Sequence, residues 1–247
     1  MKIQNIEVNS ISAAIRGMRN PKKSGHLSDS QDFIGSRDLS LAGRLIKAGT
    51  EHRKFLRMIT VTADITAPRF WWMEWDTYGH TVSNSESTMH TIMDSEFTID
   101  DFETDSTEGW DERLRELNEL RNEYIKTRNP EYFRRLIEIL PQSYRQKRTV
   151  FLNYETLLNQ YRQRKGHRLR EWSFYLEWIE QLPYMPEFLD CAGLGQNMTE
   201  EEFIRRNIES GTEDGIPWIG VPNIPGREPF TAEEIMEVLR NGKVRQD

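Results

Sequence analysis

The chain has 247 residues, a formal net charge of −7 and only 36% hydrophobic residues. This length allows one large domain, or one domain with an appendage, and either can bury a core. The negative charge argues against general binding of nucleic acid, and the absence of an apolar run of about 18 residues argues against a membrane span. One cysteine, Cys191, excludes an internal disulfide and suits a reducing compartment, so we expect a small packed thiol in a cytoplasmic protein.

Apolar spacing and turn residues predict an α+β chain. Strands are expected near residues 1–8, 56–66 and 145–152, the last after a proline. Helices are expected at residues 38–48, 108–127, 129–140, 153–165 and 169–182, and Pro68 should open a further helix rich in tryptophan. We expect a main domain over residues 1–189. Residues 190–247 should form a C-terminal extension, whose two short helices begin with capping boxes at 199–202 and 231–234.

Residues 94–112 carry nine acidic side chains and no basic one. Calcium loops place acidic residues at fixed alternate positions around a glycine, a pattern that is absent here, so a solvated loop is favoured over a metal site. The five histidines also lack the spacing of a zinc or iron site. We therefore expect no bound metal.

The charge reverses between Arg145 and Arg170, where eight Lys or Arg residues accompany one carboxylate, Glu155. Guanidinium groups bind phosphate through paired hydrogen bonds, so this segment could form an anion pocket. The alternative is a basic helix face exposed to solvent. Charge alone leaves both interpretations open.

Three of the seven tryptophans fall between Trp71 and Trp75, in a helix that should start after Pro68 and end by Gly79. A small polar loop should follow, Ser83-Asn84-Ser85-Glu86-Ser87. This layout resembles the flavin-dependent thymidylate synthases. In that family a proline-led helix with a tryptophan runs into Arg-His-Arg and then Ser-x-Asn-Glu-x-Ser-x-Arg. The tryptophan cluster is interpreted as core or subunit interface in preference to flavin stacking.

The basic segment carries a second part of the resemblance. With Leu140-Pro141 aligned to the family's leucine-proline, Asn153, Asn159 and Arg164 match without a gap. The resemblance implies that the two asparagines lie near the flavin and that the arginine contacts the uracil base of dUMP. Gly49-Thr50-Glu51 similarly resembles a Gly-His-Glu segment, which makes Glu51 a candidate at the flavin-binding rim. Together the matches span about residues 38–182.

The chain also departs from the family pattern. The Arg-His-Arg that contacts flavin is replaced by Thr77-Tyr78-Gly79, with His80 adjacent but out of register. An arginine used on the substrate phosphate is replaced by Met89. Each lost charge-assisted bond is worth roughly 1.5–3 kcal/mol, so flavin binding should be weak or lost. Lys147 or Arg148 could compensate for part of the loss.

The resemblance implies an α+β fold with a central antiparallel sheet flanked by helices. It implies flavin-dependent one-carbon transfer to C5 of a deoxyuridine nucleotide, with FAD as cofactor and NADPH and methylenetetrahydrofolate as co-substrates. A homotetramer is expected, and the divergent signature suits a phage or prophage protein, which would act in the host cytoplasm. The rival hypothesis is a non-catalytic nucleotide-binding protein that kept the fold and lost the flavin.

The candidate site residues carried over from the resemblance fall into three groups. The catalytic candidates are Ser87 and Arg164. The cofactor-binding candidates are Glu51, His80, Asn84, Asn153 and Asn159. The substrate-binding candidates are Ser85, Glu86, Ser87, Lys147, Arg148 and Arg164.

Overall fold

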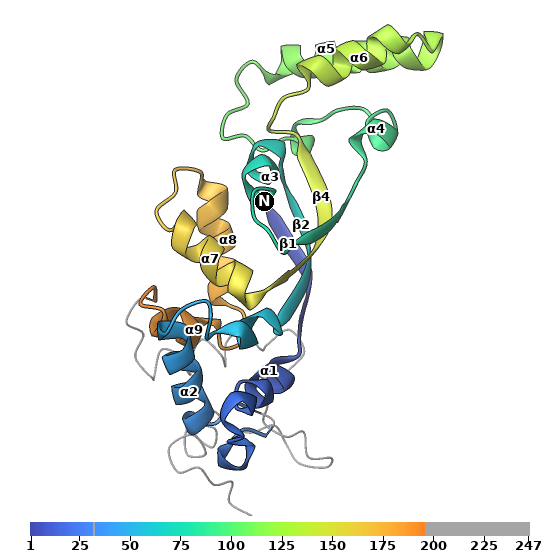
Figure 1. Ribbon diagram of the computed structural model, residues 1–247. Helices are drawn as coiled ribbons and strands as arrows, with labels where there is room; N and C mark the ends of the chain where they lie inside the picture. Colours follow the sequence, from blue (N-terminus) through green and yellow to red (C-terminus); the bar gives the residue numbers. More distant parts are fainter. Residues whose placement is uncertain (32, 196–247) are drawn as a thin grey trace, which may run out of the picture. The chain divides into compact units, whose positions relative to one another are not determined.

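The computed structural model describes residues 1–31 and 33–195, which divide between two compact units (Figure 1). The sheet unit comprises Met1–Glu7, Val61–Leu152 and Arg164–Tyr175; the helical unit comprises Val8–Thr60, Asn153–Gln163 and the chain from Leu176 on. The strands are β1 (Lys2–Asn9), β2 (Thr60–Pro68), β3 (Val82–Ser85) and β4 (Arg145–Asn153). The helices are α1 (Ile11–Gly17), α2 (Ser36–Lys47), α3 (Arg69–Trp75), α4 (Thr88–Thr91), α5 (Trp110–Thr127), α6 (Pro130–Ile139), α7 (Tyr154–Arg164), α8 (Arg170–Glu180) and α9 (Met185–Cys191).

The sheet unit is built on a four-stranded antiparallel sheet of order β1-β2-β4-β3, which confirms the expected α+β class. Alternate residues of β2, from Val61 to Ala67, are at most 1% exposed, while their neighbours are partly exposed. This period of two buries one face of the strand, as the β-branched alternation predicted. The predicted start was wrong, because Leu56 lies in a 3₁₀ turn, Lys54–Arg57, and β2 begins at Thr60.

An aromatic core lies beside the sheet, and α3 supplies most of it. Pro68 is the N-cap residue, and Trp71, Trp72 and Trp75 are at most 1% exposed. The ring of Trp71 lies 5.0 Å from that of Trp172 and 5.2 Å from that of Tyr175, both on α8. The three tryptophans of α3 are therefore core residues, as interpreted from the sequence.

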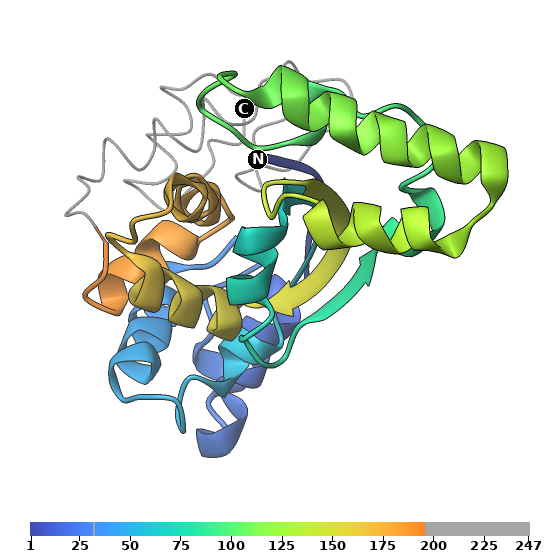
Figure 2. The ribbon, with the colours of Figure 1, turned by 90° about the horizontal axis from the view of Figure 1, so that it is seen from above.

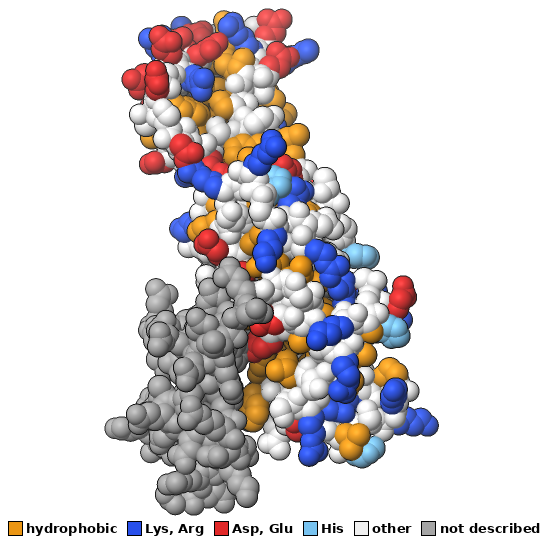
Figure 3. All heavy atoms as spheres, turned by 90° about the vertical axis from the view of Figure 1, so that its left-hand side faces the viewer, with side chains coloured by type: hydrophobic (Ala, Val, Ile, Leu, Met, Phe, Trp, Pro, Cys, Tyr) orange, Lys and Arg blue, Asp and Glu red, His pale blue; other side chains and the backbone are white. Residues whose placement is uncertain are grey.

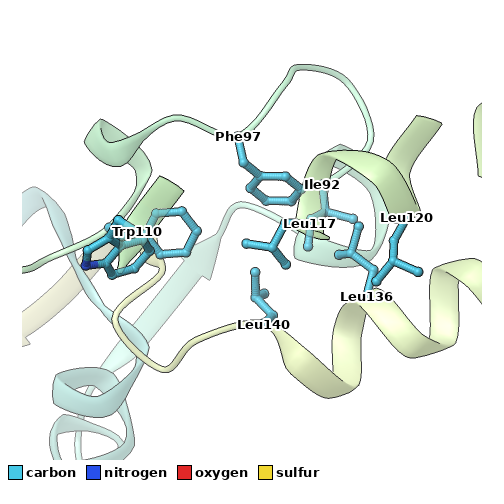
Figure 4. Packing of buried hydrophobic residues seen from close by; sticks show 8 residues of the cluster. Ile92, Phe97, Trp110, Leu117, Leu120, Leu136 and Leu140 are labelled. Atoms are coloured by element: carbon cyan, nitrogen blue, oxygen red, sulfur yellow. The ribbon is translucent and has the colours of Figure 1, made fainter. Parts of the chain in front are cut away.

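Helices α5 and α6 lie side by side as a hairpin (Figure 2), and both contribute to one apolar core. Asn129 caps α6 by accepting a 3.0 Å hydrogen bond from the backbone N–H of Glu131, the predicted role for this Asn-Pro start. The core draws on residues between 92 and 140 (Figure 4), namely Ile92, Phe97, Phe102, Trp110, Leu117, Leu120, Leu136 and Leu140.

The helical unit packs α2 against α9. A Cβ atom at Gly43 of α2 would lie 2.7 Å from Cys191 Sγ on α9, so the two helices approach closely only because this residue has no side chain. Cys191 is a free, partly buried thiol, and burial raises its pKa. This agrees with the expectation of a small packed cysteine.

Three other expectations require correction. Residues 82–85 form strand β3 instead of a loop, because their backbone pairs with β4 although their side chains are polar and exposed. Helices α4 and α9 were not predicted, and each is a single short segment. The acidic run is not simply solvated, since the side chain of Glu103 is 9% exposed and pairs with the N-terminal ammonium group, Arg145 and Arg170.

The expected C-terminal extension begins inside α9, and its two expected helices at 199–202 and 231–234 lie outside the described residues. Within the described part of the chain, no helix is long and apolar enough to cross a membrane.

Candidate functional site

The site residues predicted from the sequence are distributed between the two units. The sheet unit contains His80, Asn84, Ser85, Glu86, Ser87, Lys147, Arg148 and Arg164. The helical unit contains Glu51, Asn153 and Asn159. Each set has its own geometry.

Strand β3 presents the polar signature residues along the edge of the sheet. Asn84 pairs with Thr149 and Ser85 pairs with Arg148, both on β4, and all of β3 is exposed. Glu86 continues this pairing: its backbone N–H donates to the Lys147 carbonyl at 3.0 Å, and its Oε2 accepts from the Lys147 N–H at 3.2 Å. The backbone of Glu86 is therefore fixed, although its side chain is exposed.

Ser87 and His80 lie at the two ends of this edge segment. Ser87 is the N-cap residue of α4, and its carbonyl accepts from the backbone N–H groups of His90 and Thr91. His80 has φ +61°, in the left-handed region that a non-glycine residue rarely adopts, and its side chain is exposed. The His80 side chain is therefore exposed and that of Ser87 is half-buried, and the backbone of each is constrained.

The basic candidates of β4 already have carboxylate partners within the sheet unit. Lys147 Nζ lies 3.3 Å from Asp64, and Arg148 Nη1 donates to Asp76 at 2.7 Å. The Arg148 guanidinium also stacks on Trp72, 4.2 Å from the ring centre. These pairs offset much of the charge reversal that suggested an anion pocket.

Arg164, at the end of α7, has a largely enclosed side chain that is 18% exposed. Its Nη1 donates to Glu74 Oε2 at 2.8 Å, its Nε donates to the Tyr78 hydroxyl at 2.8 Å, and its guanidinium lies 4.5 Å from the ring centre of Trp172. Trp172 Nε1 donates to the same Glu74 oxygen at 2.8 Å. At Arg164 the alternative of a basic helix face exposed to solvent is wrong, because the guanidinium is largely enclosed and paired with Glu74.

In the helical unit, Arg53 connects two residues of α7. Its Nε lies 2.9 Å from Glu155 Oε2 and donates to Oε1 at 3.1 Å, and its Nη2 donates to Asn159 Oδ1 at 3.1 Å. The side chains of Arg53 and Glu155 are 4% and 7% exposed. Sequence reasoning missed both, and it selected Glu51, whose side chain is exposed. The available signal was the single carboxylate in a basic segment, since a buried charge requires a partner.

The orientation of both candidate asparagines follows from their donors. Asn153 Oδ1 accepts from the Thr156 backbone N–H at 3.0 Å, which makes it the predicted cap of α7. A guanidinium and a backbone N–H can only donate, so each asparagine must direct its oxygen inward. Among residues 1–31 and 33–195, no acceptor is recorded for the amide NH₂ groups of Asn153 and Asn159, so both are available as donors.

No group of three or more His, Cys, Asp or Glu side chains in the described part of the chain could hold a metal ion. Within the acidic run, the largely buried side chain of Glu103 forms ion pairs with Arg145 and Arg170.

Comparison with solved structures identifies the fold. A crystal structure of the flavin-dependent thymidylate synthase ThyX from Helicobacter pylori, complexed with FAD and dUMP, matches with a TM-score of 0.64 and 17% identity. The match covers 77% of this chain and 99% of that one. A second ThyX structure from the same organism, with FAD and dUMP, gives a TM-score of 0.63 and 16% identity, covering 78% and 99% of the two chains.

The chain therefore has the ThyX-like fold that the sequence resemblance implied. No family model matches the sequence, and no curated protein matches it either.

Proposed function

We propose that this protein binds FAD and a deoxyuridine nucleotide and catalyses flavin-dependent one-carbon transfer to C5 of the pyrimidine. The observation that carries the proposal is the ThyX-like fold, covering 99% of a neighbour crystallised with FAD and dUMP. The series Asn153, Asn159 and Arg164 on and before α7 supports it, because these residues match the family at unchanged spacing. The product is thymidylate or a related modified pyrimidine such as a hydroxymethylated one.

The residues of this chain fit the flavin ring of FAD better than its diphosphate. The flavin ring is rich in hydrogen-bond acceptors, and the free amide groups of Asn153 and Asn159 are donors. The diphosphate requires cations, and Arg148 and Arg164 are ion-paired with Asp76 and Glu74. We therefore propose weak flavin binding, held mainly through the ring, with Glu51 of the helical unit as a further polar contact. In the sheet unit, we propose Asn84 as a candidate flavin contact and His80 as a partial substitute for the family's arginines.

In this proposal, bound FAD supplies hydride chemistry, NADPH is the reductant and methylenetetrahydrofolate supplies the carbon. The chain itself positions the nucleotide. Arg164 would contact the uracil base, and Ser87 with Ser85 and Glu86 would contact the nucleotide at the exposed edge of β3. Lys147 and Arg148 would face its phosphate, at the cost of weakening their pairs with Asp64 and Asp76.

The flavin should be detectable by its visible absorption when purified protein is equilibrated with excess FAD. With NADPH, methylenetetrahydrofolate and dUMP added, we expect NADPH oxidation and a nucleotide product that mass spectrometry identifies. Asn159→Asp should abolish flavin binding, because it keeps the oxygen facing Arg53 and replaces the amide donor with a second, negatively charged oxygen. Gln163→Glu adds the same charge at an exposed position near the end of α7 and should leave flavin binding unchanged.

The alternative function is that of a non-catalytic nucleotide-binding or regulatory protein. The observation in its favour is the pairing of Arg148 and Arg164 with carboxylates, which leaves fewer cations for a diphosphate. If wild-type protein shows no bound flavin in equilibrium dialysis and no NADPH oxidation, yet binds dUMP, the alternative replaces the enzyme.

We also propose a homotetramer, since the hydrophobic content of 36% is low and an isolated subunit would bury limited apolar surface. Light scattering should give about four times the 29.3 kDa of one chain, and a single-chain mass would contradict the proposal.

We further propose that residues 1–189 form the thymidylate synthase-like domain and 190–247 its extension. A chain ending after residue 195, where α9 is complete, should retain the circular dichroism spectrum of a folded protein. An unfolded spectrum would contradict the division.

A further inference from the structure

A hollow of about 520 Å³ lies beside α2 in the helical unit. Its lining contains three arginines and two serines with one apolar residue, and no acidic or aromatic side chain among the described residues: Arg19, Leu27, Ser36, Arg37, Ser40 and Arg44. This volume lies in the range of about 300–1,000 Å³ that is usual for small-molecule sites, but the lining is far more cationic than the usual apolar one.

Two of these arginines carry charges that the described residues do not neutralise. Arg37 and Arg44 are exposed, and neither has a carboxylate within ion-pair distance in residues 1–31 and 33–195. Arg44 Nη1 donates to Ser40 Oγ at 3.2 Å, one turn earlier on the same helix, which holds the guanidinium near the hollow. In a chain of net charge −7, two unpaired arginines on one helix face are notable.

The third arginine, Arg19, is held in place by a buried carboxylate. Arg19 is 6% exposed and its Nε donates to Asp38, a carboxylate that is 0% exposed. Ser28 and Ser30 each donate to Asp38 Oδ2 at 2.6 Å. Burial alone would raise the pKa of Asp38, but the hydrogen bonds from Ser28, Ser30 and Arg19 outweigh it and lower the pKa, so the carboxylate stays charged. Arg19 is thereby preorganised at the hollow, and the uncompensated charge there is that of Arg37 and Arg44.

The N-terminus of α2 is not the ligand site, because Asp29 already accepts from the backbone N–H groups of Arg37 and Asp38 at 2.8 and 3.1 Å. Asp29 also accepts from the Ser36 hydroxyl at 3.5 Å, so the binding groups that remain are the guanidinium groups and the Ser40 hydroxyl. Lys and Arg side chains also gather on the lower part of the face in Figure 3, with few acidic ones among them. A planar guanidinium offers paired donors to phosphate oxygens.

We infer that this hollow, through Arg19, Arg37, Arg44 and the hydroxyl of Ser40, binds a small anion that carries two or more linked phosphate groups. Two unpaired positive charges match at least two negative ones, and the lack of an aromatic wall means that the phosphate chain, not a base, is recognised. The inference does not depend on the proposed flavin chemistry.

Inorganic tripolyphosphate is the probe for this site, titrated into the full chain by calorimetry at one fixed ionic strength. We expect one molecule bound per chain. Arg37→Gln with Arg44→Gln should weaken binding at least about tenfold, because two charge-assisted contacts are lost. Arg16→Gln with Lys22→Gln removes two exposed charges of the same unit outside the hollow and should change affinity by no more than about twofold.

Three results would overturn the site. Equal weakening by the two double variants would mean diffuse attraction by the whole surface. Citrate binding as tightly as tripolyphosphate would mean that charge alone, without phosphate geometry, is recognised. A short single-stranded oligonucleotide binding more tightly than tripolyphosphate, and losing affinity in both double variants, would mean a polyelectrolyte surface instead of a small-anion site.

Discussion

Replacing Arg53 with methionine should lower the free energy of unfolding by about 3–5 kcal/mol, the usual cost of leaving one charge of a buried pair without its partner. Glu155 would remain buried, and Asn159 would lose the donor that orients its oxygen. Urea unfolding followed by circular dichroism, at one protein concentration and without added flavin, measures the change.

Two further variants distinguish the cost of an uncompensated charge from the cost of lost packing. Arg53→Met with Glu155→Leu removes both charges and should recover much of the lost stability, because apolar replacement of a buried pair is often neutral. Arg57→Met alters an exposed arginine of the same 3₁₀ turn and should stay within about 0.5 kcal/mol of wild type. If the single and double variants at Arg53 were equally unstable, the cost would come from packing and not from the uncompensated charge.

Trp172→Ala should lower the free energy of unfolding by about 3–5 kcal/mol through the cavity it leaves. The indole is 0% exposed, contacts Trp71 and Tyr175, covers the Arg164 guanidinium and donates to Glu74. The same urea experiment measures this loss, and the near-ultraviolet circular dichroism of the tryptophan cluster should weaken with it.

Phe174 provides the matched control, since it lies two residues along α8 and its side chain is 46% exposed. Phe174→Ala removes an aromatic ring from the same helix and should cost much less, because little buried surface is lost. An equal loss from the two variants would show that the cost does not depend on burial of the ring, and would contradict the role of the Trp172 cavity.

The fold could be predicted from the sequence where local signals and packing agree. Pro68 and Asn129 start helices as expected, since a proline or a capping asparagine acts within one turn. Strand β3 could not be predicted, because Ser83, Asn84 and Ser85 have no strand preference and are ordered by pairing with β4, more than 60 residues away.

The candidate site was predicted less completely than the fold, because motif spacing says nothing about charge partners. Arg164 and Arg148 were selected as ligand contacts, but their pairs with Glu74 and Asp76 depend on tertiary structure. Arg53 was not selected, because its pairing also depends on tertiary structure and it belongs to no motif. Nothing near it in the chain distinguishes it from the exposed Arg57, and only its distance from Glu155, about a hundred residues later, identifies it.

The separate core of the α5–α6 hairpin has a consequence for the order in which the chain folds. The buried residues of its apolar cluster all lie between 92 and 140, so the loops that must close to form it are short. The sheet instead joins β2, which ends at Pro68, to β4, which begins at Arg145, and that closure costs more chain entropy. Once the hairpin has formed, fewer flexible residues separate Pro68 from Arg145, and closing the chain between them costs less entropy. The hairpin thus shortens the search by which β4 finds its place between β2 and β3.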